Sequence, residues 1–124
     1  MADLKKYEAL FLRNTKDLAQ KLQKILKVLS RNSGQPETVL REGQRLAHII
    51  KGSAALMDCK ILSNLFVVVE EIFSQALKNH SKIKPQILTE MNQISLEILE
   101  VDNFKKFKDN NFQNSIKTLQ ETIT

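Results

Sequence analysis

The 124-residue chain has little of several residue types: it contains three glycines, two prolines, one cysteine and no tryptophan. So few glycines and prolines leave little material for the turns of a many-stranded sheet. The single cysteine excludes an internal disulfide framework, so a reducing compartment is expected. The longest apolar run, 65–69, is much shorter than the roughly 20 residues that span a bilayer. The first ten residues have no apolar export signal. We therefore expect a cytoplasmic protein without membrane insertion.

The residues that are present have the composition of one globular domain. Hydrophobic residues make up 42% of the chain and charged residues 27%, which is typical of a folded protein and not of a disordered one. A chain of this length can bury one core but not two. Residues 1–124 are therefore predicted to form a single domain.

The formal net charge of +5 comes from 19 basic and 14 acidic side chains, and it is unevenly placed. Residues 1–31 hold eight basic and three acidic side chains, whereas residues 32–124 hold 11 of each sign. One hypothesis is therefore a basic helical binding module without chemistry, directed at nucleic acid or an anionic membrane. Such a module predicts basic residues clustered with exposed aromatics. Here the aromatics mostly occupy core positions of the helical pattern, so we expect no nucleic-acid partner.

Apolar residues recur at spacings of three, four or seven, which is the period of amphipathic α-helices. The predicted helices cover residues 3–30, 36–57, 60–79, 85–101 and 110–122. Pro36 and Pro85 suit the first positions of the second and fourth of these helices. The segment 102–111 is predicted to be a polar connection. The expected fold is all-α, an antiparallel up-down four-helix bundle with an additional C-terminal fifth helix.

Two of the predicted helices are defined by clear apolar stripes. In the first helix the stripe consists of Leu4, Tyr7, Phe11, Leu18, Leu22, Ile25 and Leu29, with Arg13, Gln20, Lys24 and Lys27 on the opposite face. In the last helix it consists of Phe112, Ile116, Leu119 and Ile123. We expect these stripes to face the core.

His48 departs from the pattern of a plain bundle. It lies two residues from both Leu46 and Ile50, which rotates it about 200° around the helix from each of them. We therefore expect its imidazole to project away from the core, toward solvent. A neutral imidazole has one donor nitrogen and one lone pair, and the lone pair can act as a nucleophile toward phosphorus.

The helical neighbours of His48 suit a phosphoryl group. Lys51, one turn along, can supply positive charge to the oxygens of a transferring phosphoryl group. Gly52 costs about 1 kcal/mol relative to alanine inside a helix, so this small residue serves either close helix packing or an open face. Arg41 and Arg45 either attract phosphate or acidic partners or simply form a solvated face. The candidate docking surface around His48 consists of Gln44, Arg45, Gly52 and Ala55.

Glu70 is the candidate hydrogen-bond acceptor for the other ring nitrogen of His48. Phe66 and Phe73, four before it and three after, place Glu70 at the edge of the buried face of its helix. An antiparallel turn near residues 58–59 puts position 48 level with positions 69–70. A carboxylate there fixes the imidazole tautomer and strengthens the nucleophile.

The run HIIKGSA at residues 48–54 resembles the H-x-x-K-G-S/G-A signature of histidine-containing phosphotransfer (HPt) domains. Glu70 stands 22 residues after His48, where the amino-terminal phosphotransfer domain of the chemotaxis histidine kinase CheA carries the glutamate that binds its phospho-accepting histidine. The resemblance covers nearly the whole chain. The fifth helix, and a motif this close to Met1, are more similar to CheA than to a free-standing HPt relay protein, which remains the alternative.

The resemblance implies that His48 accepts a phosphoryl group from the ATP-binding domain of a kinase core. The group then passes to an aspartate in the receiver domain of a CheY- or CheB-like response regulator. Lys51 would assist, Glu70 would orient the imidazole, and Gly52 would clear the docking surface. ATP and Mg²⁺ would be held by the partners, so we expect neither a cofactor nor a metal site here. The chain has no G-x-x-x-x-G-K-[ST] loop, so it should not hydrolyse ATP alone; we expect a monomer.

Two positions depart from the family pattern. Asp58 replaces the glycine usually found ten residues after the histidine, so the end of that helix is expected to differ. Val67 stands where CheA proteins often have a second histidine, so no extended hydrogen-bond network is expected. Outside the motif, His80 is expected in a solvated loop and Cys59 to be buried or inert.

Overall fold

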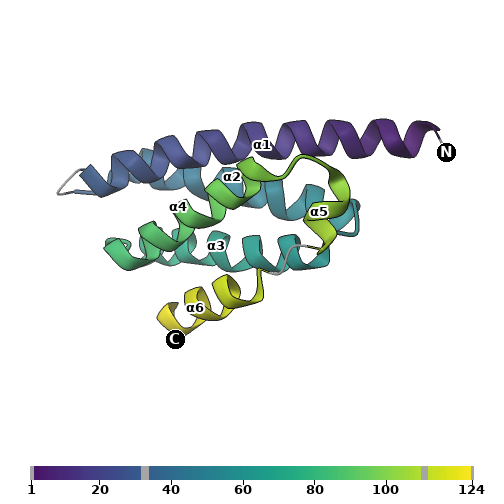
Figure 1. The fold of residues 1–124 in the computed structure, drawn as a ribbon. Coiled ribbons are helices and arrows are strands. Elements are labelled where there is room, and N and C mark those ends of the chain that lie inside the picture. The colour runs from purple at the N-terminus through teal and green to yellow at the C-terminus, as the bar shows by residue number, and fades with distance from the viewer. Residues whose placement is uncertain (1, 32–33, 110–111, 124) are drawn as a thin grey trace.

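The computed structural model describes residues 2–31, 34–109 and 112–123 (Figure 1). Its elements in these ranges are α1 (Ala2–Arg31), α2 (Glu37–Leu56), α3 (Lys60–Asn79), α4 (Pro85–Glu100), α5 (Phe104–Asp109) and α6 (Gln113–Ile123), with no strand. Helices α1 to α4 run alternately up and down and pack as a bundle, and α6 lies against α3 and α4. The predicted all-α fold with an additional C-terminal helix is confirmed.

The prolines mark helix starts close to where the sequence predicts them. Pro85 is the first residue of α4, where its missing N–H costs nothing. Pro36 precedes α2 and accepts hydrogen bonds from the N–H groups of Val39 and Leu40, each at 3.1 Å. The predicted ends differ from the observed ones by one residue: α2 begins at Glu37 and ends at Leu56, and α4 ends at Glu100.

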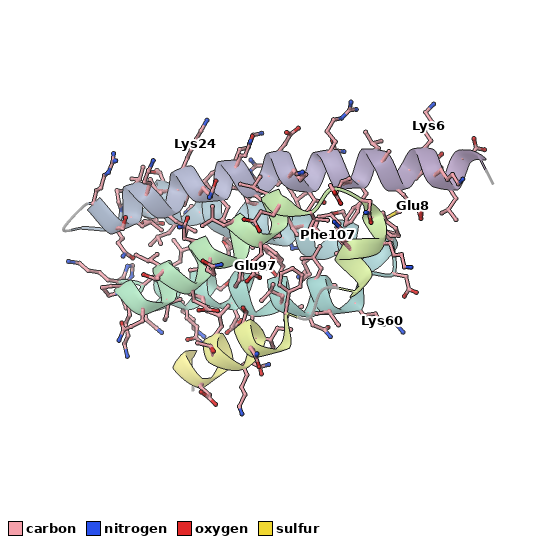
Figure 2. The ribbon with its side chains drawn as sticks, in the orientation of Figure 1. Lys6, Glu8, Lys24, Lys60, Glu97 and Phe107 are labelled. Atoms are coloured by element: carbon pink, nitrogen blue, oxygen red, sulfur yellow. The ribbon has the colours of Figure 1, made fainter. Side chains whose placement is uncertain are left out.

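The prediction of a polar connection over 102–111 is wrong, because α5 lies inside it. Phe107 is fully buried and points into the end of the bundle (Figure 2). Its ring packs edge-on against Phe11 of α1 with centroids 5.7 Å apart, and Phe104 does the same at 5.9 Å. Two aromatic rings three residues apart close this end of the core despite the lysines around them.

The predicted final helix, 110–122, corresponds to α6, which begins at Gln113; residues 110 and 111 lie outside the described part of the chain. Phe112, Ile116 and Leu119 are buried, as the stripe predicts. The side chain of Ile123 lies outside the described residues.

The first apolar residues of α1 do not reach the core. Leu4 and Tyr7 are 56% and 60% exposed, which contradicts their predicted place in the buried stripe. The N-terminal turns of α1 extend past the ends of the helices that it packs against (Figure 1). No helix in the described part of the chain covers the stripe there, whereas from Phe11 onward it is covered.

Close packing of α2 on α3 brings together the two helix edges that carry the candidate site. Gly43 is buried in α2, and a Cβ atom added there would overlap the ring of Phe73 on α3. The two backbones can therefore approach closely only because position 43 has no side chain. The interface is apolar, with these residues fully buried: Leu46, Ala47, Ile50, Ala54, Leu62, Leu65, Phe66 and Phe73. This interface aligns the polar edges of the two helices, where His48 and Glu70 lie.

The turn from α2 to α3 shows how Asp58 takes the place of the glycine that the family usually has there. Asp58 has a φ of 58°, in the left-handed region, which is usually left to glycine at a helix end. Its N–H donates to the carbonyl of Ala55 at 3.1 Å, and the N–H of Cys59 donates to that of Ala54 at 2.8 Å. The two bonds form a Schellman motif. The backbone geometry that a glycine would favour is therefore kept with an aspartate.

Asp58→Gly is expected to stabilise the fold by about 0.5–1 kcal/mol, because glycine has no Cβ to strain in the left-handed region. Thermal unfolding measures this as a rise in Tm of about 2–5 °C. Asn64→Gly, at an exposed position inside α3, should instead lower stability by about 0.3–0.5 kcal/mol. A fall in Tm for Asp58→Gly would contradict a strained turn.

Candidate functional site

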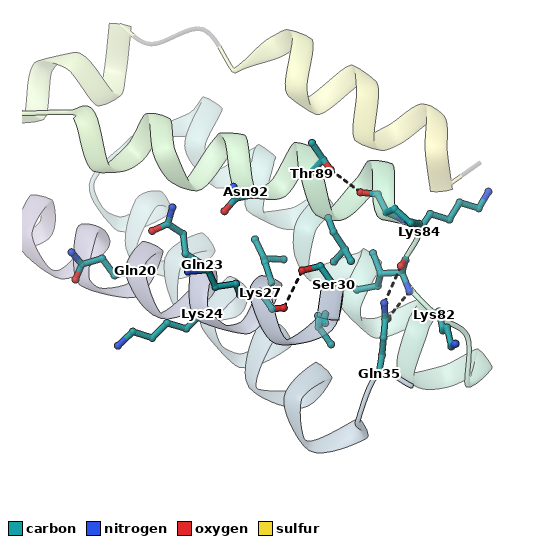
Figure 3. A pocket seen from close by; sticks show the side chains of 15 residues that line it. Gln20, Gln23, Lys24, Lys27, Ser30, Gln35, Lys82, Lys84, Thr89 and Asn92 are labelled. Atoms are coloured by element: carbon teal, nitrogen blue, oxygen red, sulfur yellow. Dashed lines mark hydrogen bonds between the residues drawn. The ribbon is translucent and has the colours of Figure 1, made fainter. Parts of the chain in front are cut away.

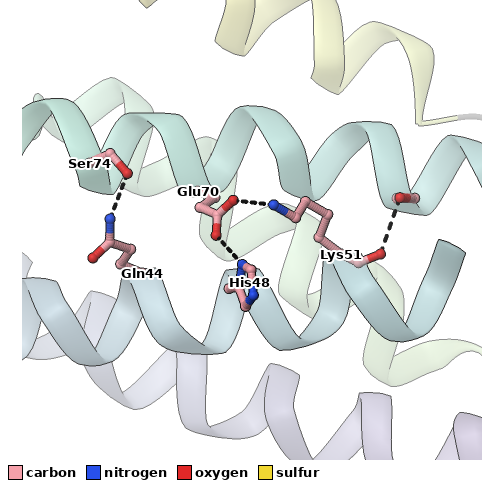
Figure 4. A network of polar contacts seen from close by, with 6 residues as sticks. Gln44, His48, Lys51, Glu70 and Ser74 are labelled. Carbon is pink, nitrogen blue, oxygen red and sulfur yellow. Dashed lines mark hydrogen bonds and ion pairs between the residues drawn. The ribbon is translucent and has the colours of Figure 1, made fainter.

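His48 projects from α2 into solvent. Its side chain is 68% exposed, while Ala47 and Ile50 beside it are fully buried. The imidazole stands over the seam between α2 and α3 (Figure 4). The predicted exposure of His48 is confirmed.

Glu70 holds both His48 and Lys51 through one carboxylate group. The Nδ1 atom of His48 lies 2.7 Å from Oε2 of Glu70, and Nζ of Lys51 donates to Oε1 at 2.5 Å. Figure 4 shows the two contacts side by side along the seam. The structure thus brings together all three residues that the sequence singles out. The pairing of Lys51 with Glu70 was not predicted, since Lys51 was expected to face only a phosphoryl group.

The pKa of the Glu70 carboxyl reflects two opposing effects. Its partial burial raises the pKa, but the hydrogen bonds from Lys51 and His48, together with their charges, lower it more, so that the pKa lies below its usual value. Glu70 is therefore an ionised carboxylate at neutral pH, which can only accept hydrogen bonds. The proton of the neutral imidazole consequently sits on Nδ1, and the lone pair sits on the solvent-exposed Nε2.

This arrangement makes Nε2 an oriented nucleophile. If Nε2 attacks an electrophile, positive charge develops on the ring while Nδ1 keeps its proton, and the Glu70 carboxylate stabilises that charge. His48 does not line the groove of about 1200 Å³ between α1 and α4. A side chain this exposed suits a group that enters the active site of another protein.

The four residues of the predicted docking surface differ in their exposure. Gly52 and Ala55 are exposed, and a Cβ at position 52 would meet nothing within 4 Å. Arg45 is exposed and forms an ion pair with Glu42. Gln44 is half-buried, because its Nε2 donates to Oγ of Ser74 on α3 at 2.6 Å. Three of the four therefore form an open surface, and Gln44 ties α2 to α3.

The arginines near His48 are already paired. Arg41 contacts Glu37 one turn earlier at 2.6 Å, and Arg45 contacts Glu42 at 2.5 Å. The Arg45 hydrogen bond holds the pKa of Glu42 below its usual value despite some opposing desolvation. Exposed pairs of this kind contribute about 0–1 kcal/mol each, so they leave both guanidinium groups in the solvated face of α2.

Of three residues near the site, Val67 was singled out from the sequence only as a departure from the family pattern, and Ser63 and Leu56 were not singled out. Ser63 of α3 donates from Oγ to the carbonyl of Lys51 at 3.1 Å. Val67 is 49% exposed and Leu56, at the end of α2, is 88% exposed. Ser63 and Val67 lie seven and three residues before Glu70, so helical spacing alone places them on the same face of α3 as Glu70. The exposure of Leu56 depends on where α2 ends and had no such signal.

Other chemically reactive groups lie away from this site. His80 is exposed at the end of α3 and Cys59 is buried, as predicted. Among the residues that the structure describes, no three His, Cys, Asp or Glu side chains lie together so as to hold a metal ion. No described helix is long and apolar enough to cross a membrane.

The comparison with protein families matches the Hpt domain to residues 7–104. The chain therefore belongs to the Hpt domain family. No curated protein and no solved structure matches it. The match includes the whole of α2, α3 and α4, and thus His48, Lys51 and Glu70, while α6 follows it. As an Hpt domain, the chain has a phosphotransfer role in two-component signalling, a role in which such domains interact with kinases and response regulators.

Proposed function

We propose that this Hpt domain is the phosphotransfer domain of a CheA-type chemotaxis kinase, with His48 as its phospho-acceptor. The observation that carries the proposal is the 2.7 Å contact between Nδ1 of His48 and the carboxylate of Glu70. Glu70 is the residue that resembles the orienting glutamate of CheA, and the contact leaves Nε2 exposed. His48, Lys51 and Glu70 then act as one unit.

In the first step Nε2 of His48 attacks the γ-phosphorus of ATP held by the kinase partner. The Nε2–P bond forms as the bond from phosphorus to the bridging oxygen breaks, and ADP leaves with that electron pair. Nδ1 keeps its proton, so the ring becomes cationic and its charge is stabilised by Glu70. Mg²⁺ held by the kinase partner would neutralise the phosphate oxygens.

In the second step the phosphoryl group passes to an aspartate of a receiver domain. A carboxylate oxygen attacks the phosphorus, the Nε2–P bond breaks, and its electron pair returns to Nε2. The ring becomes a neutral Nδ1–H imidazole again, ready for another cycle. Glu70 therefore keeps the same hydrogen bond throughout, and no other protonation site of this chain is needed.

The surface beside His48 suits docking by a globular partner. Gly52 has no side chain and Ala55 a small one, so the exposed face of α2 beside the imidazole leaves room for a partner to approach. Leu56 and Val67 add exposed apolar area near it, which is the composition expected of an interface centre. The receiver domain and the kinase domain would use this surface in turn, because each must reach Nε2.

The proposal is tested by asking which donor phosphorylates the chain. A CheA-type kinase core without its own phosphotransfer domain, with labelled ATP and Mg²⁺, should place acid-labile label on the chain. A CheY-like receiver should then remove it. Label gained only from a phosphorylated receiver would overturn the CheA assignment in favour of a free-standing relay protein. Label gained from neither donor would overturn phospho-acceptance altogether.

Lys51→Ala is expected to slow phosphorylation by about fivefold, which corresponds to about 1 kcal/mol, the upper range for a partly exposed charge contact. The loss is moderate because Lys51 contacts Glu70 and not the imidazole itself. Initial rates with the kinase core measure it, and Lys51→Arg should retain most of the rate. Lys78→Ala, at the far end of α3, is the matched control. A defect as large as the loss of His48 would contradict this secondary role.

A further inference from the structure

A second surface feature lies between the C-terminal half of α1 and the start of α4. It is a groove of about 1200 Å³ that extends from Gln20 to Ser30 along α1 and from Lys82 to Asn92 on the other side (Figure 3). Gln35 closes one end, since its side-chain amide accepts from the N–H of Ile83 at 2.7 Å and donates to the carbonyl of Ile83 at 3.0 Å. These two hydrogen bonds tie the segment before α2 to the segment before α4 at that end of the groove.

The rim of this groove is strongly basic. Four lysines line it, Lys24, Lys27, Lys82 and Lys84, and no aspartate or glutamate of the described residues does. All four are exposed, and none forms an ion pair within the described part of the chain. By contrast, the cations of α2 that surround His48 are paired with carboxylates. The unpaired ammonium groups form a local positive potential that favours an anionic partner.

The interior of the groove is apolar with polar amides at its edges. Leu26, Leu29, Ile83 and Leu88 form its floor and are at most 5% exposed. The apolar surface that a ligand can reach is therefore that of Pro85, which is exposed, and of the methylene stems of the lysines. Gln20, Gln23 and Asn92 are on the same lining, with amide groups suited to hydrogen bonds with peptide groups. A ligand that carries negative charge together with some apolar side chains matches this lining.

We propose that this groove binds an acidic amphipathic segment of a partner protein. Its leucine-like side chains would lie against Pro85 and the methylene stems of the lysines, and its carboxylates would face the ammonium groups of the rim. The groove is larger than the roughly 300–1,000 Å³ of typical small-molecule pockets. No aromatic side chain of the described residues lines it, so bases of a nucleotide or nucleic acid would have no ring to stack on. A helix laid between two helices satisfies all of these features.

The groove lies on a different side of the bundle from His48. In Figure 3 α1 and α4 are in front of α2 and α3, whereas in Figure 4 α2 and α3 are in front of α4. A segment bound in the groove therefore leaves the imidazole accessible. The groove would hold a partner to the domain without occupying the phosphotransfer surface, and this inference does not depend on which kinase phosphorylates His48.

Fluorescence anisotropy with a labelled 16-residue peptide, leucine at every third or fourth position and glutamate elsewhere, tests the proposal. The Lys24→Glu/Lys84→Glu variant is expected to weaken binding at least about tenfold, since two favourable charge contacts become repulsive. Lys5→Glu/Lys6→Glu, with the same change of charge at exposed positions of α1 outside the groove, should weaken it less than about twofold. Equal weakening by both variants would overturn the proposal in favour of non-specific attraction.

Amide NMR of the unmodified chain provides a second test that needs no variant to fold. The peptide should shift the side-chain amide signals of Gln23 and Asn92 and leave the backbone signal of His48 unchanged. A scrambled peptide of the same charge, with its leucines dispersed, should shift them less. No shift at the groove, or tighter binding there of a single-stranded oligonucleotide than of the peptide, would overturn the assignment.

Discussion

His48→Gln is expected to abolish phosphorylation of the chain by a CheA-type kinase core. Glutamine approximates the length and polarity of histidine but has no nitrogen lone pair to attack phosphorus. The fold should be unaffected, because the side chain is 68% exposed and substitutions at such positions usually change stability by less than about 0.5 kcal/mol. Acid-labile label from ATP is the measurement, because a phosphoryl group on nitrogen is lost in acid and one on a hydroxyl is retained.

The second histidine of the chain provides the control for this prediction. His80 is exposed at the left-handed end of α3, and asparagine tolerates that backbone conformation. His80→Asn should therefore be phosphorylated like the unmodified chain. NMR of the product should place the phosphoryl group on Nε2 of His48, since Nδ1 is bound to Glu70. Label that persists in His48→Gln, or that is lost in His80→Asn, would refute His48 as acceptor.

Glu70→Ala should slow phosphorylation about 10- to 100-fold, by analogy with metal-binding histidines, where removal of the carboxylate that orients the ring has effects of this size. Two effects combine: the imidazole loses the acceptor that holds its proton on Nδ1, and the cationic ring loses its counter-charge. The fold should persist, because Glu70 lies at the edge of the α2–α3 interface and not in its apolar part. An initial rate equal to that of the unmodified chain would remove Glu70 from the mechanism.

Glu70→Gln separates the two effects. Glutamine can still accept from Nδ1 but carries no charge, so its rate should fall between those of the unmodified chain and Glu70→Ala. Nitrogen chemical shifts of the imidazole report the tautomer directly, and a merely structural role would not change them. We expect the Nδ1–H form in the unmodified chain and in Glu70→Gln, and a mixture of tautomers in Glu70→Ala. A mixture already present in the unmodified chain would contradict the orienting role.

The lowered pKa of Glu70 predicts that the stability difference between the unmodified chain and Glu70→Gln depends on pH. Because the pKa of Glu70 is lower in the folded chain than its usual 4.5, the carboxylate contacts stabilise the fold above that value. The contribution is lost as the pH falls below 4.5 through the lower folded pKa. The difference in unfolding free energy between the unmodified chain and Glu70→Gln should therefore be constant near neutral pH and shrink in acid. A difference that grows in acid would contradict the lowered pKa.

The local features of this protein were predictable from its sequence. Helical periodicity identifies four long helices, and the two-residue offset of His48 from Leu46 and Ile50 predicts its exposure. The placement of Glu70 followed from one further step, an antiparallel turn at Asp58. Each of these predictions uses only spacing along one helix or across one short connection, where backbone geometry alone determines which residues share a face.

The scarcity of glycine and proline and the helical period of the apolar residues determined the fold class, but the tertiary structure decided which surfaces matter. Tyr7 follows the apolar stripe and is still exposed, because burial depends on how far the neighbouring helices extend. Phe107 lies among lysines and is still buried, because α5 covers the end of the core. Lys51 shares the carboxylate of Glu70, and two pairs of lysines that are far apart in sequence line one groove. Such contacts arise from packing between helices. The periodicity within a single helix carries no information about them.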